Sequence, residues 1–417
     1  MKKRFRIHLI IAGFLLIISI IGSVTAVTLV PSWREYPAGD ATFSGVMIST
    51  DGSMVFASGN QLFVRSWNGD TRWGGLSGTV ATMSSDGNYV VSAIDDNVRK
   101  FNKTGSEIWN RITGSPFRAV AVSGNGSLVI AADNRGYIRS WTNEGNKLGL
   151  NKTDLVKRIE ISPSKSLVVV ISEDGLKFFS PAMDQIWVDN RMGNLDSFIA
   201  FSADSSTVIT SGDTMVSSYT NSGELNWVKD VTPNAITDMA CSEDATTIVL
   251  GSQDGNVLVL NQLGKEQWTY PAGSWINGVG VSRDGSIIAA GALDRNLYIL
   301  NQEGQLLAKT RTDTIIQQRS VAVSRDGKRV VVADQVALYG YELLGLPEAT
   351  SRETFTPAPL FTVTSSTPVP ITTTLPKTPP PTTTVPVTAS TPASPLNPCL
   401  AIVALSGLLL VVIRRNN

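Results

Sequence analysis

The sequence offers few residues for covalent or metal chemistry. Its 417 residues include one histidine, His8, and two cysteines, Cys241 and Cys399. His8 lies in a basic and then apolar leader of the kind that secreted proteins lose, so neither a Ser-His-Asp hydrolase nor a histidine-ligated metal site is expected. The cysteines stand in different contexts, one in a globular region and one beside a terminal apolar run, which excludes a cysteine-rich zinc site. We expect no cofactor and no metal ion.

Aspartate recurs at one turn of a repeated pattern, at Asp95, Asp96, Asp133, Asp174, Asp213, Asp254, Asp294 and Asp334. In a ring of repeats these acids would line one rim, where a cation or a polycationic partner could bind. Aspartate also suits tight turns, because its carboxylate accepts local backbone hydrogen bonds and its backbone tolerates left-handed geometry. We favour the turn role, since the acids would spread around the ring instead of converging on one point.

The repeat that carries these acids is marked by a turn of the form Ser-x-Asp-Gly, often degenerate. Its serines are Ser49, Ser84, Ser123, Ser162, Ser202, Ser242, Ser282 and Ser324, at spacings of 35, 39, 39, 40, 40, 40 and 42 residues. A β-branched run follows each turn, and two further short strands come after it, separated by Gly, Asp and Asn turns. Four short antiparallel strands in each of eight repeats predict an all-β fold, an eight-bladed β-propeller over residues 31–344.

Tryptophan marks the fourth strand of most repeats, at Trp73, Trp109, Trp187, Trp227 and Trp268, and Trp33 near the N-terminus stands in a similar context. A bulky aromatic at a fixed position fills the space between neighbouring blades, so we assign these residues to blade packing. The last repeat reaches Pro347 without a fourth strand. The stretch from Ser32 to Gly39 parallels that from Gln267 to Gly273, so the N-terminal strand is predicted to complete blade eight, pairing both ends of the domain.

The repeat resembles those of known propeller families. Asp254-Gly255-Asn256-Val257, Leu260-Asn261 and Glu266-Gln267-Trp268 look like the repeat of pyrroloquinoline-quinone propellers, and the Ser-x-Asp-Gly turns resemble those of WD40 and related propellers. The resemblance implies a propeller architecture. Quinoprotein dehydrogenases would add a quinone, a calcium ion and an aspartate base, but the chain lacks the adjacent cysteine pair that many of them carry, and no residue here can be assigned as a calcium ligand or as the base.

The N-terminus has the features of a secretory signal peptide, residues 1–26. Lys2, Lys3, Arg4 and Arg6 precede the apolar stretch from Leu9 to Ile21, and small residues lead to a plausible cleavage site after Ala26. An uncleaved anchor is the alternative. Both place the propeller outside the cytoplasm, because the basic flank stays inside.

The C-terminal part has a different composition. Residues 345–398 are rich in threonine and proline, with 12 of the 20 prolines between residues 357 and 398, which predicts an extended stalk of the O-glycosylated kind or an unmodified linker. Residues 399–413 are apolar and precede Arg414 and Arg415, as in a short membrane anchor. Stalk, Pro395-Leu396-Asn397-Pro398, apolar run and arginines together resemble archaeal and bacterial C-terminal sorting signals.

Charge and glycosylation motifs narrow the choice of partners. Residues 31–344 hold 27 basic and 33 acidic side chains, a net charge of −6, which argues against nucleic acid as a partner. Sequons begin at Asn102, Asn125 and Asn151 and suit a secreted glycoprotein.

Two functions fit the sequence. The first is a monomeric, non-catalytic cell-surface scaffold that binds a protein or glycan, with the membrane reached through the C-terminus. The second is an extracellular enzyme, glycan-active or quinone-dependent, that uses the propeller channel. Glycosidases need two converging carboxylates. Glu160 and Asp238 are placed near innermost strands but two blades apart, so the sequence identifies no catalytic pair.

Overall fold

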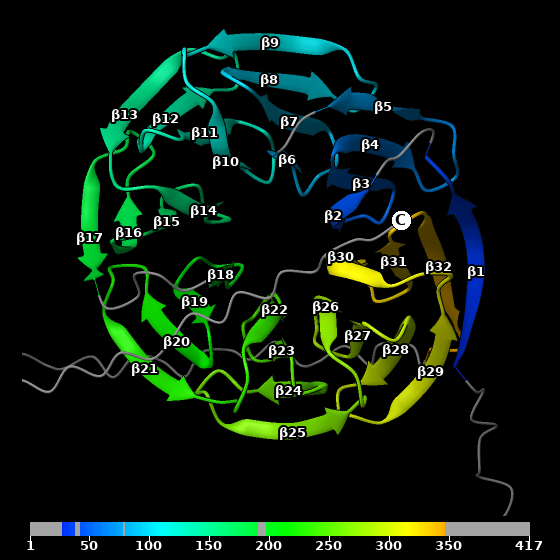
Figure 1. The fold of residues 1–417 in the computed structure, drawn as a ribbon. Helices are drawn as coiled ribbons and strands as arrows, with labels where there is room; N and C mark the ends of the chain where they lie inside the picture. Colours follow the sequence, from blue (N-terminus) through cyan, green and yellow to red (C-terminus); the bar gives the residue numbers. More distant parts are fainter. Residues whose placement is uncertain (1–26, 38–41, 78–79, 191–196, 347–417) are drawn as a thin grey trace, which may run out of the picture. The chain divides into compact units, whose positions relative to one another are not determined.

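The computed structural model describes residues 27–37, 42–77, 80–190 and 197–346. Their 32 strands form eight four-stranded antiparallel sheets, arranged as the blades of a ring (Figure 1). The predicted eight-bladed β-propeller is therefore confirmed. The expected signal peptide, most of the stalk and the C-terminal apolar segment lie outside the described residues. Within the described part of the chain, no helix is long and apolar enough to span a membrane.

Each blade runs from an innermost to an outermost strand. Blade 1 contains β2 (Phe43–Ile48), β3 (Met54–Gly59), β4 (Gln61–Ser66) and β5 (Arg72–Ser77), and blade 2 contains β6 (Val80–Met83), β7 (Tyr89–Ile94), β8 (Asn97–Asn102) and β9 (Glu107–Ile112). Blade 3 contains β10 (Phe117–Val122), β11 (Leu128–Asp133), β12 (Tyr137–Thr142) and β13 (Lys147–Lys152), and blade 4 contains β14 (Val156–Ile161), β15 (Val168–Ser172), β16 (Gly175–Phe179) and β17 (Gln185–Asp189).

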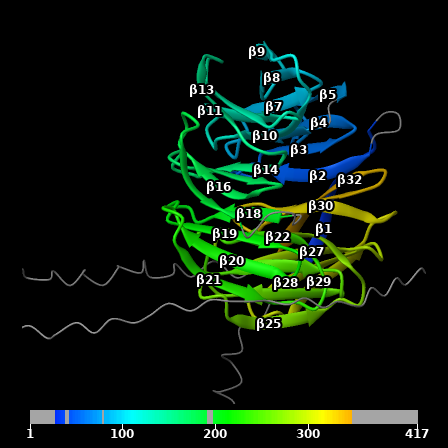
Figure 2. The same cartoon turned by 60° about the vertical axis from the view of Figure 1, so that its left-hand side comes forward.

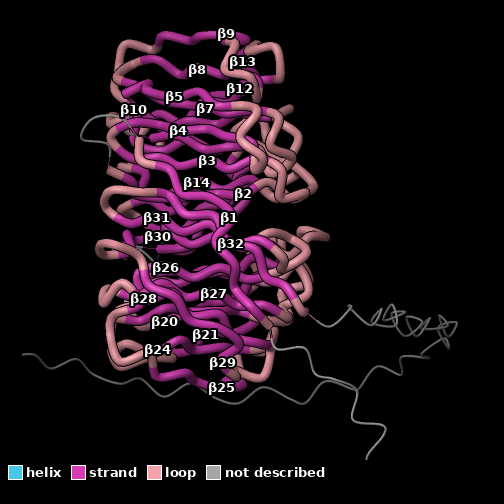
Figure 3. Tube along the Cα trace, turned by 90° about the vertical axis from the view of Figure 1, so that its right-hand side faces the viewer, coloured by secondary structure: helices cyan, strands magenta, loops and turns pink. Residues whose placement is uncertain are grey.

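Blades 5 to 7 follow the same order. Blade 5 contains β18 (Ser197–Phe201), β19 (Thr207–Gly212), β20 (Met215–Thr220) and β21 (Leu225–Asp230), and blade 6 contains β22 (Ile236–Cys241), β23 (Ile248–Ser252), β24 (Asn256–Leu260) and β25 (Glu266–Pro271). Blade 7 contains β26 (Ile276–Val281), β27 (Ile287–Ala292), β28 (Asn296–Asn301) and β29 (Leu306–Arg311). The loops and turns gather on two opposite faces of the ring (Figure 3).

Blade 8 is assembled from both ends of the domain, as predicted. It contains β30 (Ile316–Val323), β31 (Arg329–Asp334) and β32 (Leu338–Leu344), and β1 (Thr28–Glu35) adds the outermost strand. β1 pairs antiparallel with β32, and Trp33 lies opposite Gly340. The N-terminal strand thus occupies the edge that β32 would otherwise leave open (Figure 1).

The Ser-x-Asp-Gly motif is a self-contained hydrogen-bonded turn between the first two strands of a blade. In blade 7, the Ser282 hydroxyl donates to Oδ1 of Asp284 at 2.7 Å and accepts the backbone N–H of Ile287 at 3.0 Å. Asp284 also accepts the N–H of Ser286, and Gly285 has φ +74°. Serine is buried because its hydroxyl is fully used inside the turn, and glycine is favoured where φ is positive.

The hydrophobic core lies between blades, in eight clusters that each join two neighbouring blades. Blade sheets therefore pack face to face around the ring (Figure 2). Tryptophans on the outermost strands cover glycines in the next blade: a Cβ on Gly105 would come within 2.8 Å of Trp73, and one on Gly223 within 2.4 Å of Trp187. A side chain in place of either glycine would displace the indole from the interface between the two blades, which we call a seam.

Candidate functional site

The innermost strand of blade 8 departs from the other blades. In β10, β14, β22 and β26 the register with the second strand shifts by one extra residue, for example between Ile276 and Gly278. In β30 the pairs are Ile316 with Asp334 and Val321 with Val332, which leaves residues 317–320 in one enlarged bulge. A bulge of this size redirects side chains away from the sheet. The two additional residues account for the spacing of 42 between Ser282 and Ser324.

The enlarged bulge reaches blades that are not its neighbours. Gln318 donates from Nε2 to the carbonyl of Thr237 in blade 6 at 3.4 Å. The guanidinium carbon of Arg319 lies 4.6 Å from the ring centroid of Phe198 in blade 5. Arg319 has φ +58°, a left-handed conformation that a non-glycine residue rarely adopts. The bulge thus brings side chains of blade 8 to the innermost strands on the other side of the ring.

Charged side chains from blades 4, 6 and 8 form one electrostatic cluster, and its two arginines lie against the Phe198 ring. Arg158 of β14 lies 5.6 Å from the same ring and pairs with Glu160 at 3.4 Å. Asp238 of β22 is buried and accepts the backbone N–H of Val279 at 2.9 Å. We call Arg158, Glu160, Phe198, Asp238 and Arg319 the axial cluster.

Both carboxylates of the axial cluster are perturbed by burial. Burial raises the pKa of Asp238 to about 6, although the Val279 N–H, Arg319 and Arg158 act in the opposite direction. Burial likewise raises the pKa of Glu160, against the influence of Arg158 and Arg319. The Glu160 side chain is nevertheless 39% exposed. It therefore lies at the edge of open space, with protein on its other sides. Desolvation outweighs ion pairing at both groups.

Glu160 and Asp238 therefore belong to one electrostatic cluster, although they come from blades 4 and 6. Their pairing cannot be predicted from the sequence, because 78 residues separate them and neither belongs to the repeated motif. Each carboxylate has the same two guanidinium groups, Arg158 and Arg319, as its electrostatic partners. A carboxyl group with a pKa near 6 can act as a general acid, but two carboxylates matched by two arginines also form a charge-balanced brace between blades.

The aspartates of the predicted rim lie at or beside the turns between second and third strands. Their carboxylates bind neighbouring groups of the same turns: Asp254 and Asp294 accept the N–H groups of Asn256 and Asn296, and Asn97 donates to Asp96 at 2.9 Å. Asp95 and Asp213 have φ +49° and +52°, the left-handed geometry that aspartate tolerates.

The remaining three rim aspartates have fuller hydrogen bonding. Asp133 accepts two backbone N–H groups and pairs with Arg139 at 2.9 Å. Asp174 binds Ser172 and Lys177, and Asp334 accepts the hydroxyl of Tyr339 at 2.7 Å. Among the described residues, no group of three or more His, Cys, Asp or Glu side chains could hold a metal ion.

The tryptophans assigned to blade packing lie on the outermost strands, and four of them add a hydrogen bond to the next blade. Nε1 of Trp73, Trp109, Trp227 and Trp268 donates to the carbonyls of Lys103, Asn143, Gln262 and Gln302, at 2.7 to 2.9 Å. Trp187 packs against Phe178 and Tyr219. Trp33 differs, because its buried Nε1 has no hydrogen-bond partner. Its ring instead contacts Trp67, with 5.4 Å between centroids, and the guanidinium of Arg65.

The three sequon asparagines are in different local environments. Asn151 donates from Nδ2 to the carbonyl of Met183 at 2.7 Å, so its amide nitrogen is engaged with the next blade. Asn102 and Asn125 instead use Oδ1 to accept bonds within their own turns, from Thr104 and Ser127. A glycan at Asn151 would therefore be attached to a nitrogen that faces the next blade.

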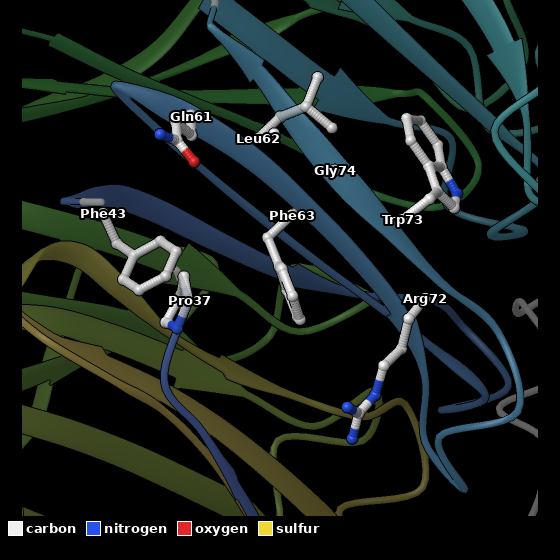
Figure 4. A pocket seen from close by; sticks show the side chains of 9 residues that line it. Pro37, Phe43, Gln61, Leu62, Phe63, Arg72, Trp73 and Gly74 are labelled. Carbon is white, nitrogen blue, oxygen red and sulfur yellow. The ribbon is translucent and has the colours of Figure 1, made fainter. Parts of the chain in front are cut away.

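The surface of the described residues includes a hollow at blade 1 and another between blades 6 and 7. One, of about 270 Å³, lies at blade 1 and is lined mainly by apolar and aromatic residues, with Gln61 and Arg72 as polar members (Figure 4). The other, of about 480 Å³, lies between blades 6 and 7 and is lined mainly by polar residues, among them Gln267, Gln302 and Glu303.

Comparison with known proteins agrees with the ring of blades. A family model described as "beta-propeller protein" matches residues 136–309. The described part of the chain has the fold of a β-propeller. The solved β-propeller domain of Cps50 (Swd1) from Myceliophteria thermophila is similar to it, with 13% identity, a TM-score of 0.51, and coverage of 64% of this chain and 97% of that domain. No curated protein matches the sequence significantly. The likeness to Cps50 shows the fold alone, so the chemistry of this propeller has to be argued from its own residues.

The axial cluster was missed by sequence reasoning, although one signal for it is present. The last spacing of 42 residues shows that repeat eight is longer than the others. Measured from the first residue of the innermost strand to the turn serine, Ile276 to Ser282 and Ile236 to Ser242 both span six positions, and Ile316 to Ser324 spans eight. Locating the insertion in the innermost strand requires the strand boundaries, which the spacing of serines does not supply.

Proposed function

We propose that the protein is a non-catalytic propeller that binds a protein or glycan partner outside the cell. The observation that carries this proposal is the arrangement of the axial cluster. Glu160 and Asp238 share Arg158 and Arg319 as electrostatic partners, and both arginines lie against the Phe198 ring, so the cluster draws its residues from blades 4, 5, 6 and 8. In this proposal the cluster braces the ring, and ligands bind on its outer surfaces.

The location outside the cell is part of the same proposal. Its support is the sequence: a leader of signal-peptide type at residues 1–26, a threonine- and proline-rich segment at 345–398 and an apolar segment at 399–413 followed by two arginines. In this arrangement the stalk holds the propeller away from the membrane, and the C-terminal segment attaches it.

Binding of the full-length protein to glycan and protein arrays tests the function. We expect selective retention of one ligand class with no change in the mass of the retained ligand. Chain cleavage of a bound glycan, or the absence of selective binding across both arrays, would contradict a non-catalytic binding role.

An extracellular glycan-active enzyme is the second candidate, favoured by the raised pKa of Asp238 and by the presence of a second carboxylate in the same cluster. The two functions predict different behaviour of Asp238→Asn and Glu160→Gln. For an enzyme both variants should lose cleavage by a hundredfold or more and retain binding. For the scaffold no cleavage is measurable in the parent protein, and both variants bind as the parent does.

A further inference from the structure

The seam between blade 8 and blade 1 is built differently from the two seams that precede it along the chain, between blades 6 and 7 and between blades 7 and 8. In blade 7, Tyr298 lies opposite Lys309 across the strand pair, and the ammonium lies 4.6 Å from the ring centroid. In blade 8, Tyr339 lies opposite Arg34, whose guanidinium is 4.8 Å from the ring centroid. In both blades a long cationic side chain covers an aromatic ring.

In blade 1 the corresponding pair is Phe63 and Gly74. Glycine has no side chain to cover the ring, and the hollow of about 270 Å³ lies at this position. Phe63 also lacks the hydroxyl with which Tyr298 donates to the carbonyl of Ala272 and with which Tyr339 donates to Asp334. Blade 1 thus has phenylalanine where blades 7 and 8 have tyrosine, and glycine where they have a long cationic side chain. Of the three seams compared, only the one between blades 8 and 1 leaves a face of its aromatic ring uncovered.

The lining combines apolar walls with two polar side chains. Phe63 and Arg72 project toward Pro37 and Phe43, while Leu62 and Trp73 project to the opposite side of the sheet (Figure 4). Phe43 is buried, so this wall is fixed in the core of the seam. Gln61 places an amide at the end of the hollow, where it can donate and accept hydrogen bonds.

Positive charge exceeds negative charge beside the hollow. Arg65 and Arg72 pair with the same oxygen of Glu35, at 3.2 and 3.0 Å, so two guanidinium groups share one carboxylate. Arg65 is buried against the Trp33 ring, whereas the Arg72 side chain is 54% exposed and keeps donors available for a second anion. A guanidinium in this position selects a carboxylate over a neutral group.

We propose that this hollow, which we call the seam pocket, binds a sugar ring that carries a carboxylate, that is, a uronic acid unit of an acidic glycan. The inference rests on the proposed function, because it names the ligand class for a glycan-binding propeller. The sugar ring packs on the open face of Phe63, its carboxylate pairs with Arg72, and its hydroxyl groups bond to Gln61. The volume, near the lower limit of about 300 Å³ for small-ligand pockets, suits a single ring.

Ligand-detected NMR titration of the full-length protein with methyl β-D-glucuronide, methyl β-D-glucoside and benzoate tests the pocket. We expect the glucuronide to bind at least tenfold more tightly than the glucoside. Arg72→Gln should abolish that preference, and Phe63→Leu should weaken both sugars. Lys309→Gln is the matched control, because it removes one exposed positive charge from the outermost strand of blade 7. It should change the affinity for neither sugar. Thermal denaturation of each variant checks that the fold is retained.

Several outcomes would overturn the seam pocket. These are equal affinity for the two sugars, the same affinities in Arg72→Gln as in the parent, or binding of benzoate without the glucuronide. Array binding by the full-length protein separates this failure from failure of the proposed function. If Arg72→Gln and Phe63→Leu retain array ligands as the parent does, the pocket assignment is wrong and the scaffold function stands. If the parent retains no ligand, the proposed function fails as well.

Discussion

At the scale of single residues, the turns after the innermost strands show how much of the repeat is backbone geometry. The fourth turn position is glycine in five blades, but Lys165, Ser205 and Ala245 occupy it in blades 4, 5 and 6 with φ values of 62°, 61° and 54°. A left-handed conformation costs a non-glycine residue about 1 to 2 kcal/mol. The degenerate copies of the motif are therefore held in place by the surrounding blades.

This strain predicts opposite effects of two substitutions. Lys165→Gly should raise the free energy of unfolding by about 0.5 to 1 kcal/mol, because glycine adopts the turn without the steric cost. Gly285→Ala should lower it by more than 1 kcal/mol, since its Cβ would also lie 2.4 Å from Oγ1 of Thr247. Chemical denaturation measures both. A stability loss in Lys165→Gly would contradict the strain argument.

Asp238 predicts a dependence of stability on pH. Its pKa is about 6 in the folded protein and near 3.8 when unfolded, so the folded state holds a proton that the unfolded state has released between these values. Stability is therefore lost as pH rises from about 4 to beyond 6. Asp238→Asn removes this loss and still offers an acceptor to the Val279 N–H. The variant should be more stable than the parent at pH 8 by roughly 1 to 3 kcal/mol and equal to it at pH 4.

Arg158 and Arg319 also act on this carboxyl group, and Glu160 shares both of them, so the comparison needs a control. Turn aspartates such as Asp204, whose pKa is lowered chiefly by hydrogen bonds from Ser202 and Ser206, lose their stabilising contribution only as pH falls through their low pKa. Asp204→Asn should therefore show no gain at pH 8. An Asp238→Asn variant that is less stable than the parent at pH 8 would mean that ion pairing, not desolvation, dominates at this site.

At the scale of structural elements, six of the eight outermost strands of the described domain carry a tryptophan that packs against the next blade. Trp227 donates to the carbonyl of Gln262 in the next blade at 2.9 Å, whereas the Nε1 of Trp33 is buried without an acceptor. Both rings are partly buried, so replacement by phenylalanine removes packing at both sites. What differs is the hydrogen bond between blades.

Trp227→Phe should therefore destabilise the protein by about 1 to 2 kcal/mol more than Trp33→Phe does. The removal of an unsatisfied N–H from Trp33 should offset part of the lost packing. The difference between the two free energies of unfolding measures the seam hydrogen bond. Equal losses would show that the indole N–H groups contribute nothing and that the tryptophans act by area alone.

Some structural elements can be predicted from the sequence, and the contacts of others cannot. The turns and strands follow from local chemistry: Ser282, Asp284 and Gly285 satisfy one another within a few residues, so each copy is recognisable by itself. The enlarged bulge of β30 is equally local, but its consequence is not. Arg319 contacts Phe198 only because ring closure brings blade 8 toward blade 5. The two residues are 121 positions apart in the sequence.

At the scale of the whole molecule, closure explains why the charged cluster and the seam pocket both involve blade 8. This blade joins the two ends of the domain, and it contains the extra residues of β30 as well as the strand β1 that forms one wall of the blade 8 to blade 1 seam. The eight-fold period and the missing last strand were enough to predict closure. The pocket could not be predicted, because it depends on Phe63 facing Gly74 across strands whose register the period does not specify.

Attachment to the cell is the prediction that concerns the whole chain. If the C-terminal end holds the propeller outside the cell, removal of residues 396–417 should release soluble protein into the medium, because the truncated chain keeps its leader and loses its apolar segment. Cell fractionation and the intact mass of the parent protein measure this. Loss of mass near Pro398 indicates processing by a sorting enzyme, and retention of Arg414 and Arg415 indicates a plain anchor. Truncated protein that stays in the membrane would instead assign the anchor to the uncleaved N-terminal segment.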